Sequence, residues 1–201
     1  MTAALERAWP LAGATDLRDE LLAAYGDPGR GYHDTRHLGE VLERLDELAA
    51  AGVTFEPRAV RLAAWFHDAV YDGRAGAEER SAQWAEQALQ GLLEAGEVAE
   101  VARLVRLTEH HRPDEGDVNG CALSDADLAV LASAPERYRR YVDDVRHEYA
   151  TVPDVEFRRG RAAVLRALVD QERLFRTPHA WEQWEAAARR NVADELAGLE
   201  A

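Results

Sequence analysis

Apolar residues recur every three to four positions along most of the chain, whereas the alternation expected of half-buried β-strands is almost absent. From about residue 33 to residue 50 this helical period places two histidines and three aliphatic residues on one stripe: His33, His37, Val41, Leu45 and Leu48. Gly52 follows the stripe and is expected to end the helix. We therefore predict a helix whose apolar face carries His33 and His37, one turn apart.

A second apolar stripe begins after Pro57, a residue that suits the first turn of a helix. Val60, Ala63, Ala64 and His67 follow the i, i+3, i+4, i+7 spacing of one helix face. His67 is therefore expected to point where the core points.

Further helices are expected at residues 16–25, 77–95 and 97–111, with Gly96 separating the last two. Three N-cap signatures each predict the start of a helix: Ser124-x-x-Asp127, Ser133-x-Pro135-Glu136 and Thr151-x-Pro153-Asp154. Thr177-Pro178 is expected to open the last helix. The pattern predicts one all-α domain over residues 1–201, built from about eight or nine helices.

Composition and charge narrow the class of protein. A length of 201 residues fits one domain with a sizeable core. No apolar run approaches the roughly 20 residues that span a bilayer, no signal peptide is recognisable, and the single cysteine, Cys121, excludes an intrachain disulfide. We expect a cytoplasmic protein with no membrane partner. The net charge of −14 argues against a nucleic-acid polymer as partner, and a homodimer stays open.

Histidine and aspartate occur in a pattern that indicates a metal site. His33, His37 and the adjacent pair His67-Asp68 offer imidazole and carboxylate ligands for a divalent ion. Neighbouring helical residues diverge by about 100°, so His67 and Asp68 reach one ion only at the edge of their helix. A lone histidine is more often a core or surface residue. A buried carboxylate such as Asp68 needs a partner, however, and a metal ion supplies one.

Two further pairs are candidates for the remaining ligands. Asp125 and Asp127 precede a leucine, and their ordinary roles would be the first helical turn and the capping box. His110 and His111 end the helix predicted from residue 97, where the helix dipole favours histidine. The apolar face of that helix includes His111 and leaves His110 outside it.

The set formed by His37, His67-Asp68 and an aspartate in an Ala-Asp-Leu context resembles the HD superfamily of metal-dependent phosphohydrolases. That superfamily is helical, and the resemblance implies an HD-type helical bundle. It also implies metal ligands at His37, His67, Asp68 and Asp127, with Asp125 as the alternative to Asp127.

The stretch Tyr32-His33-Asp34-Thr35-Arg36-His37 is similar to the Tyr-His-Asn-x-x-His motif of cyclic nucleotide phosphodiesterases. This chain has Asp34 where that motif has asparagine. In those enzymes the first histidine protonates the leaving oxygen and the second binds metal. The similarity therefore implies that His33 is the general acid.

Over roughly residues 20–195 the chain resembles a subgroup of small bacterial HD hydrolases. The shared motifs are Phe66-His67-Asp68-x-x-Tyr71, Glu79-x-Ser81-Ala82, Asp125-Ala126-Asp127-Leu128, and Arg146-x-Glu148-Tyr149 followed by Gly160-Arg161. This chain lacks the second histidine that many two-metal members carry soon after the His-Asp pair. His111 or Glu79 would have to replace it, so one metal or two stays open.

The resemblance implies a hydrolase of a small phosphate ester or nucleotide. A divalent ion (Mn, Mg, Co, Ni, Fe or Zn) would activate water, Asp68 would orient or deprotonate that water, and His33 would protonate the leaving group. Arginines suit the substrate phosphate. The candidates are Arg36, Arg146, Arg161 and Arg189, although a solvated surface arginine is the commoner role of each.

Two other functions stay open. An HD-type di-iron oxygenase would need about two more ligands, for which His110, His111 and Glu79 are the sources. A non-catalytic helical protein that binds a metal or another ligand is the other. Metal analysis separates them, because two irons favour the oxygenase and no divalent metal favours the binding protein.

Overall fold

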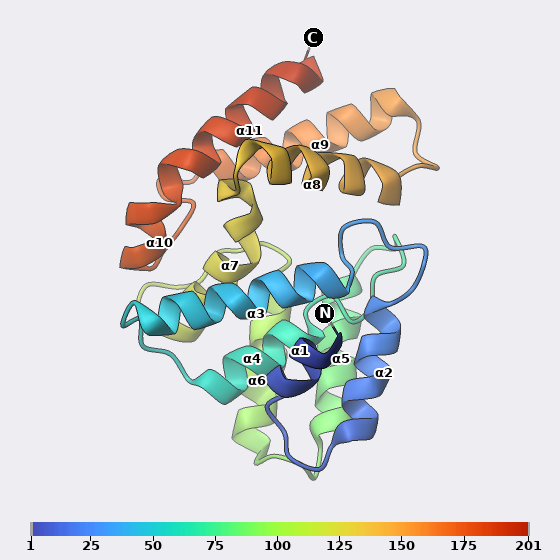
Figure 1. The fold of residues 1–201 in the computed structure, drawn as a ribbon, viewed down its shortest axis with the longest axis vertical. Helices are drawn as coiled ribbons and strands as arrows, with labels where there is room; N and C mark the ends of the chain where they lie inside the picture. Colours follow the sequence, from blue (N-terminus) through green and yellow to red (C-terminus); the bar gives the residue numbers. More distant parts are fainter. Residues whose placement is uncertain (1, 201) are drawn as a thin grey trace.

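The computed structural model describes residues 2–200, and helices account for nearly all of its regular structure (Figure 1). The first half contains α1 (Thr2–Ala8), α2 (Thr15–Tyr25), α3 (Thr35–Ala50), α4 (Pro57–Phe66), α5 (Ala77–Leu89) and α6 (Ala95–Leu107). The second half contains α7 (Val118–Leu128), the 3₁₀ helix η1 (Ala129–Ala132), α8 (Pro135–Glu148), α9 (Asp154–Val169), α10 (Pro178–Gln183) and α11 (Glu185–Glu200).

The all-α prediction is confirmed for the described part of the chain, which has an isolated β-bridge between Gln90 and Leu93 but no strand. The helix count of eight or nine was too low, since eleven α-helices lie within residues 2–200. The additional helices are short or follow a break: α1 has seven residues, and Trp184 separates α10 from α11. None of the helices in this range has an apolar stretch long enough to cross a membrane.

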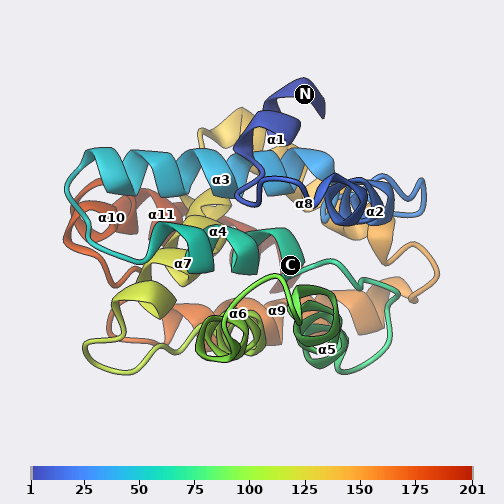
Figure 2. The ribbon, with the colours of Figure 1, turned by 90° about the horizontal axis from the view of Figure 1, so that it is seen from below.

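Helix α4 lies at the centre of the molecule. In the view of Figure 2 it runs beneath α3, and it packs against α3, α6 and α7. Its sequence explains this position, because Ala59, Val60 and every residue from 62 to 66 are buried, so the helix is apolar on nearly all sides. Pro57 begins it as predicted. The second lobe, α8 to α11, joins this core through α7 and η1, and η1 packs on α11 and α8 (Figure 1).

The N-terminus of α3 differs from the prediction in a way that matters for the site. The carboxylate of Asp34 accepts hydrogen bonds from the backbone N–H groups of Arg36 and His37, so α3 begins at Thr35 and not at residue 33. His33 therefore precedes the helix and does not share its face with His37. The predicted end is confirmed. Gly52 has a φ of 85°, and Val53 donates its N–H to the carbonyl of Leu48, as in a Schellman motif.

The C-terminal ends of α4 and α6 also fall earlier than predicted. Helix α4 ends at Phe66, so the His67-Asp68 pair lies in the turn that follows it. Helix α6 ends at Leu107, so His110 and His111 lie in a turn and not in the last turn of a helix. The break before α6 spans residues 90–94, and Gly96 is in its first turn instead of separating two helices. His67 keeps helical backbone angles (φ −55°, ψ −40°), whereas His111, with a φ of 50°, has a backbone conformation that a continuous helix forbids.

Of the predicted helix starts, Thr177 is confirmed as an N-cap, because its hydroxyl accepts from the N–H of Ala180. The capping box at Ser124 was wrong, since α7 begins at Val118 and is capped by the side chain of Asp117. Helices α8 and α9 begin close to the predicted positions, at Pro135 and Asp154, without side-chain caps from Ser133 or Thr151. Their starts are set by the prolines at or just before the first turn.

Candidate metal centre

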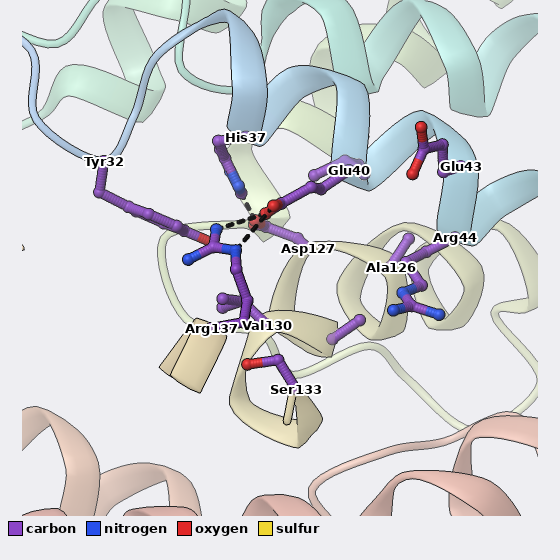
Figure 3. A pocket seen from close by; sticks show the side chains of 12 residues that line it. Tyr32, His37, Glu40, Glu43, Arg44, Ala126, Asp127, Val130, Ser133 and Arg137 are labelled. Carbon is purple, nitrogen blue, oxygen red and sulfur yellow. Dashed lines mark hydrogen bonds and ion pairs between the residues drawn. The ribbon is translucent and has the colours of Figure 1, made fainter. Parts of the chain in front are cut away.

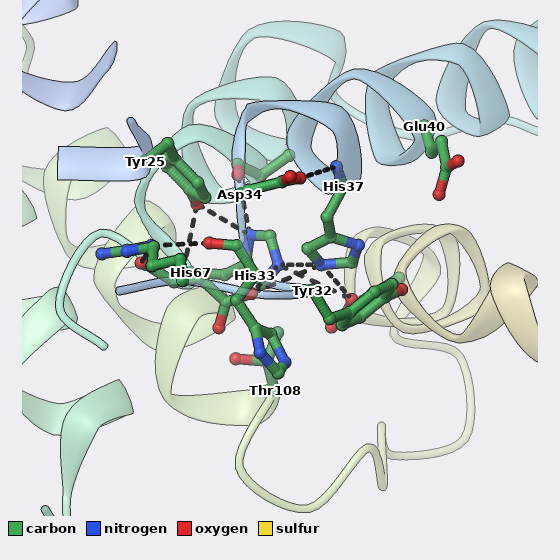
Figure 4. Close-up of polar contacts among 12 residues, drawn as sticks. Tyr25, Tyr32, His33, Asp34, His37, Glu40, His67 and Thr108 are labelled. Carbon is green, nitrogen blue, oxygen red and sulfur yellow. Dashed lines mark hydrogen bonds and ion pairs between the residues drawn. The ribbon is translucent and has the colours of Figure 1, made fainter. Parts of the chain in front are cut away.

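Four of the predicted ligands meet where α3, α4 and α7 pack together. His37 comes from the first turn of α3, His67 and Asp68 from the turn after α4, and Asp127 from the last turn of α7. Figure 4 shows the ring of His37 reaching from α3 toward His67. Both imidazoles are about 1% exposed, whereas 14% of the Asp68 side chain and 13% of the Asp127 side chain face solvent. The cluster is therefore closed on the protein side and open on one edge.

The distances between the donor atoms match those of ligands on one ion. The Nε2 atoms of His37 and His67 are 3.1 Å apart. Asp68 Oδ2 lies 3.3 Å from the first and 3.0 Å from the second, and Asp127 Oδ1 lies at 3.1 and 3.6 Å. Two ligands about 2.1 Å from one ion and at right to tetrahedral angles are about 3.0–3.4 Å apart. His37, His67 and Asp127 could together hold a metal ion. Asp68 is not in that group of three, but its Oδ2 lies within 3.3 Å of both histidine nitrogens.

The tautomer of His67 is fixed by its surroundings. Its Nδ1 lies 2.7 Å from the carbonyl of Ala64, which can only accept, so Nδ1 carries the hydrogen and donates it. The lone pair of Nε2 is then directed at the cluster, as in a metal-binding histidine oriented by a backbone carbonyl. Because the Nε2 atom of His37 faces it at 3.1 Å, the two lone pairs repel unless a proton or a cation lies between them.

The pKa shifts of the four residues also indicate that the cluster is stabilised by positive charge. Burial lowers the pKa of His37, but hydrogen bonds to Asp127 and Asp68 outweigh burial and raise that pKa to about 9. Burial is likewise outweighed at His67, whose pKa the neighbouring Asp68 carboxylate raises well above the usual value. The carboxyls respond in the opposite sense. Burial raises their pKa, but His67 above all lowers the pKa of both Asp68 and Asp127 well below the ordinary range. Protons on the imidazoles thus balance the carboxylates, and a divalent cation is the alternative to those protons.

His111 lies beside the outer oxygen of Asp127. Its Nε2 is 3.6 Å from Asp127 Oδ2, its Nδ1 is 3.2 Å from the hydroxyl of Ser124, and burial lowers its pKa, which favours the neutral ring a metal needs. Its φ of 50° places a non-glycine residue in the left-handed region, a strained conformation that functional sites often contain. Asp127 therefore offers one oxygen to the pair of histidines and the other to His111.

His33 stands at the open edge of the cluster, held by a buried glutamate. Its Nδ1 is 2.7 Å from Glu148 Oε2, and its ring stacks on Tyr71 with centroids 4.0 Å apart. The other carboxylate oxygen, Glu148 Oε1, accepts from the backbone N–H groups of residues 31, 32 and 33. With Nδ1 committed to Glu148, the Nε2 of His33 remains for other partners. After His67, His33 is among the neighbours that lower the pKa of Asp68.

Asp125, the alternative last ligand, is directed elsewhere. Its carboxylate is fully buried and accepts from the backbone N–H groups of Arg176 and Thr177, which hold the segment before α10 against α7. Burial raises its pKa to about 6 even though those hydrogen bonds oppose the rise. The structure thus assigns the two aspartates different positions, with Asp127 in the cluster and Asp125 in a structural contact.

The arginines named as phosphate candidates are occupied by protein groups. Arg36 pairs with Asp144, with a nitrogen–oxygen distance of 2.6 Å. Arg161 pairs with Glu195 at 2.7 Å, and Arg189 with Glu185 at 2.6 Å. Arg146 donates to the carbonyls of Tyr149 and Val152. The structure brings none of these four to the histidine cluster. The predicted additional ligands Glu79 and His110 are also outside it: Glu79 pairs with Arg106, which holds its pKa at about 2, and the His110 side chain is 72% exposed.

Three residues of the site were not identified from the sequence as functional. Arg30 donates to the carbonyls of His33, Asp68 and Ala69, and so ties the loop before α3 to the turn after α4. The hydroxyl of Tyr25 accepts from the N–H of Asp68, and burial raises its pKa. Glu148 holds His33. The only sequence signal for Glu148 was its place in a shared motif, since no spacing rule relates residues 33 and 148.

Comparisons of the chain with protein-family models, with curated proteins and with solved structures find no match. The assignment of this site therefore depends on its own geometry.

The two aspartates can be separated with isosteric variants. Asp127→Asn should lower divalent-metal affinity at least tenfold, because it removes a charged donor from the cluster. Asp125→Asn should leave metal affinity within about twofold and reduce the free energy of unfolding by about 1.5–3 kcal/mol, because an amide cannot accept both backbone hydrogen bonds. Metal titration and denaturant unfolding of both variants measure this. An equal loss of affinity in the two would contradict the assignment.

Metal affinity should also rise with pH. The pKa of His37 is raised to about 9, so below pH 9 a proton occupies the nitrogen that a metal ion needs. The apparent affinity should therefore increase by about tenfold per pH unit for each proton displaced, and level off above pH 9. Titrations with Mn²⁺ between pH 6.5 and 9 measure the slope, with the exposed His110→Ala variant as control. A pH-independent affinity would show that metal binding displaces no proton from these imidazoles, and would contradict their role as ligands.

Proposed function

We propose that this protein is a metal-dependent hydrolase of small phosphate esters, of the HD type. The observation that carries the proposal is the convergence of His37, His67, Asp68 and Asp127: the two histidine Nε2 atoms are 3.1 Å apart, and one oxygen of each aspartate lies 3.0–3.6 Å from them. The ring of His33 lies beside them, with its centroid 5.7 Å from that of His37. A site of two imidazoles and two carboxylates leaves coordination positions for water and substrate. When bound, a divalent ion supplies charge to phosphoryl oxygens and lowers the pKa of a coordinated water.

Two residues around the ion would carry out the proton-transfer and positioning steps. Asp68 lies at the solvent-facing edge of the cluster with a strongly lowered pKa, so it is ionised and able to orient an attacking water through its second oxygen. His33 would act on the leaving group. Its Nδ1 is fixed by Glu148 and its ring by Tyr71, so the imidazole is already oriented before substrate arrives.

The geometry supports the hydrolase better than the di-iron oxygenase. A second ion would find Asp127 Oδ2 and His111 on the described part of the chain, but Glu79 and His110 lie away from the cluster. The non-catalytic reading is weakened by the strain at His111 and by the His33–Glu148 pair, since neither is needed to bind a single structural ion.

The direct test is a phosphohydrolase screen over nucleotides, cyclic nucleotides, phosphomonoesters and pyrophosphate, with Mn²⁺, Mg²⁺, Co²⁺ and Ni²⁺ in turn. The wild type should turn over at least one class only in the presence of metal, and Asp68→Asn should abolish that turnover. The Asp125→Asn protein is the matched control, because it changes an aspartate of the same chain that lies outside the cluster. Metal-independent turnover, or none with any substrate, would contradict the proposal.

The role of His33 can be tested through the leaving group. His33→Ala should keep metal affinity while lowering kcat about 10²- to 10⁴-fold for an alkyl phosphate, whose leaving oxygen needs a proton. The loss should be much smaller for a nitrophenyl phosphate, whose leaving group departs without one. His110→Ala, at an exposed histidine, should change neither rate. If both substrates lose equally, or metal is lost too, His33 is a ligand or a structural residue.

A further inference from the structure

A cavity of about 160 Å³ adjoins the candidate metal centre. It lies between α3 and the segment that runs from the end of α7 through η1 to the start of α8 (Figure 3). Two of its wall residues, His37 and Asp127, are candidate metal ligands. The other polar residues of the wall are Tyr32, Glu40, Glu43, Arg44, Ser133 and Arg137. A molecule in this cavity would therefore lie directly against the metal cluster.

Three polar atoms of this wall are buried without a hydrogen-bond partner among the described residues. They are the hydroxyls of Tyr32 and Ser133 and the Nη1 nitrogen of Arg137. Tyr32 as a whole is only 3% exposed. Buried polar groups are nearly always paired in folded proteins, and each unpaired one destabilises the fold. All three belong to residues that line one cavity, where a bound molecule could supply the missing partner.

The chemistry of these atoms defines that partner as an acceptor. Arg137 is fixed by Glu40, whose two oxygens take Nε at 2.8 Å and Nη2 at 2.5 Å. Only Nη1 remains, and a guanidinium nitrogen can only donate. The guanidinium also lies over the Tyr32 ring, 5.9 Å from its centre, so the two side chains are neighbours in the cavity wall. Hydroxyls can donate as well, so all three groups are satisfied together by a ligand rich in acceptor oxygens.

The acidic groups around the cavity do not exclude an anion. Glu40 is neutralised by its bidentate pair with Arg137, and Asp127 by its contact with His37. Glu43 is exposed to solvent, and Arg44 in the same wall pairs with Glu47. A divalent ion on His37 and Asp127 would add positive charge beside the cavity.

We propose that this cavity is a subsite for a small oxyanion, filled by a phosphoryl group of the substrate and held by Tyr32, Ser133 and Arg137. The proposal rests on the proposed phosphohydrolase function for its choice of phosphate, but not for the site itself. Its volume sets the size of the occupant. Pockets for drug-sized ligands measure about 300–1,000 Å³, so 160 Å³ accommodates a phosphoryl group with a few attached atoms and not a whole nucleotide.

Removing an unpaired hydroxyl gives a test that separates binding from stability. Tyr32→Phe and Ser133→Ala should each weaken the binding of inorganic phosphate about three- to tenfold, because each deletes one hydrogen bond to the anion. Neither should lower the melting temperature, because neither hydroxyl bonds to protein. Tyr138→Phe is the matched control: its hydroxyl donates to Glu195 at 2.5 Å outside the cavity. That variant should lose stability and keep phosphate affinity.

Calorimetric titration with phosphate, in Mn²⁺ and in EDTA-treated protein, measures these affinities, and acetate in a parallel arm distinguishes a phosphoryl from a carboxylate occupant. If the anion affinity falls in Tyr32→Phe and Ser133→Ala, with Mn²⁺ or without metal, the subsite is supported. The anion whose affinity falls, phosphate or acetate, identifies the chemical class of the occupant. Phosphate affinity that is the same in both variants and the wild type overturns the subsite. Turnover is measured separately. If the wild type is inactive but its phosphate binding depends on Tyr32 and Ser133, the hydrolase function is rejected and the subsite stands. If it is active but its phosphate binding does not depend on them, the subsite is rejected and the hydrolase function stands.

Discussion

The burial of two histidines and two aspartates at one point is the constraint on which the rest of the site depends. Desolvating four ionisable groups is costly unless their charges balance at short range. In this cluster one oxygen of Asp68 and one of Asp127 each lie 3.0–3.6 Å from the Nε2 atoms of His37 and His67, the spacing of neighbouring ligands around one cation. Because they come from α3, α4 and α7, the packing of these three helices and the integrity of the cluster are coupled.

The loops around the cluster are held by charged side chains that hydrogen-bond to backbone. Arg30 donates to carbonyls of the loop before α3 and of the turn after α4. Glu148 accepts hydrogen bonds from three backbone N–H groups of the loop before α3 and orients the ring of His33. Such contacts fix geometry more strictly than apolar packing does, because hydrogen bonds are directional. In the proposed hydrolase, this would orient His33 and the metal ligands before substrate binds. Among the described residues, the hydroxyl of Tyr32 in this loop has no hydrogen-bond partner.

Helical periodicity was sufficient to predict the all-α fold and the burial of His37 and His67, because both residues lie on strongly apolar stripes. It was not sufficient where a side chain overrides the period. The N-cap Asp34 starts α3 two residues later than predicted, so His33 is not on the helix face that carries His37. The N-cap Asp117 starts α7 before the predicted start at Ser124, so Asp127 lies in the last turn of that helix and not in its first. The partners of Glu148 and of the candidate arginines follow from contacts between residues distant in sequence, about which local pattern carries no information.

If the cluster of His37, His67, Asp68 and Asp127 holds a divalent ion, as we propose, calorimetric titration of metal-free protein with Mn²⁺ will detect it. The wild type should bind with an affinity that falls at least tenfold in Asp68→Asn, which keeps the shape of the side chain and removes its charge. His110→Ala, outside the cluster, should bind as the wild type does. Undiminished Mn²⁺ affinity in Asp68→Asn, or no binding by the wild type, would contradict a metal site at this cluster.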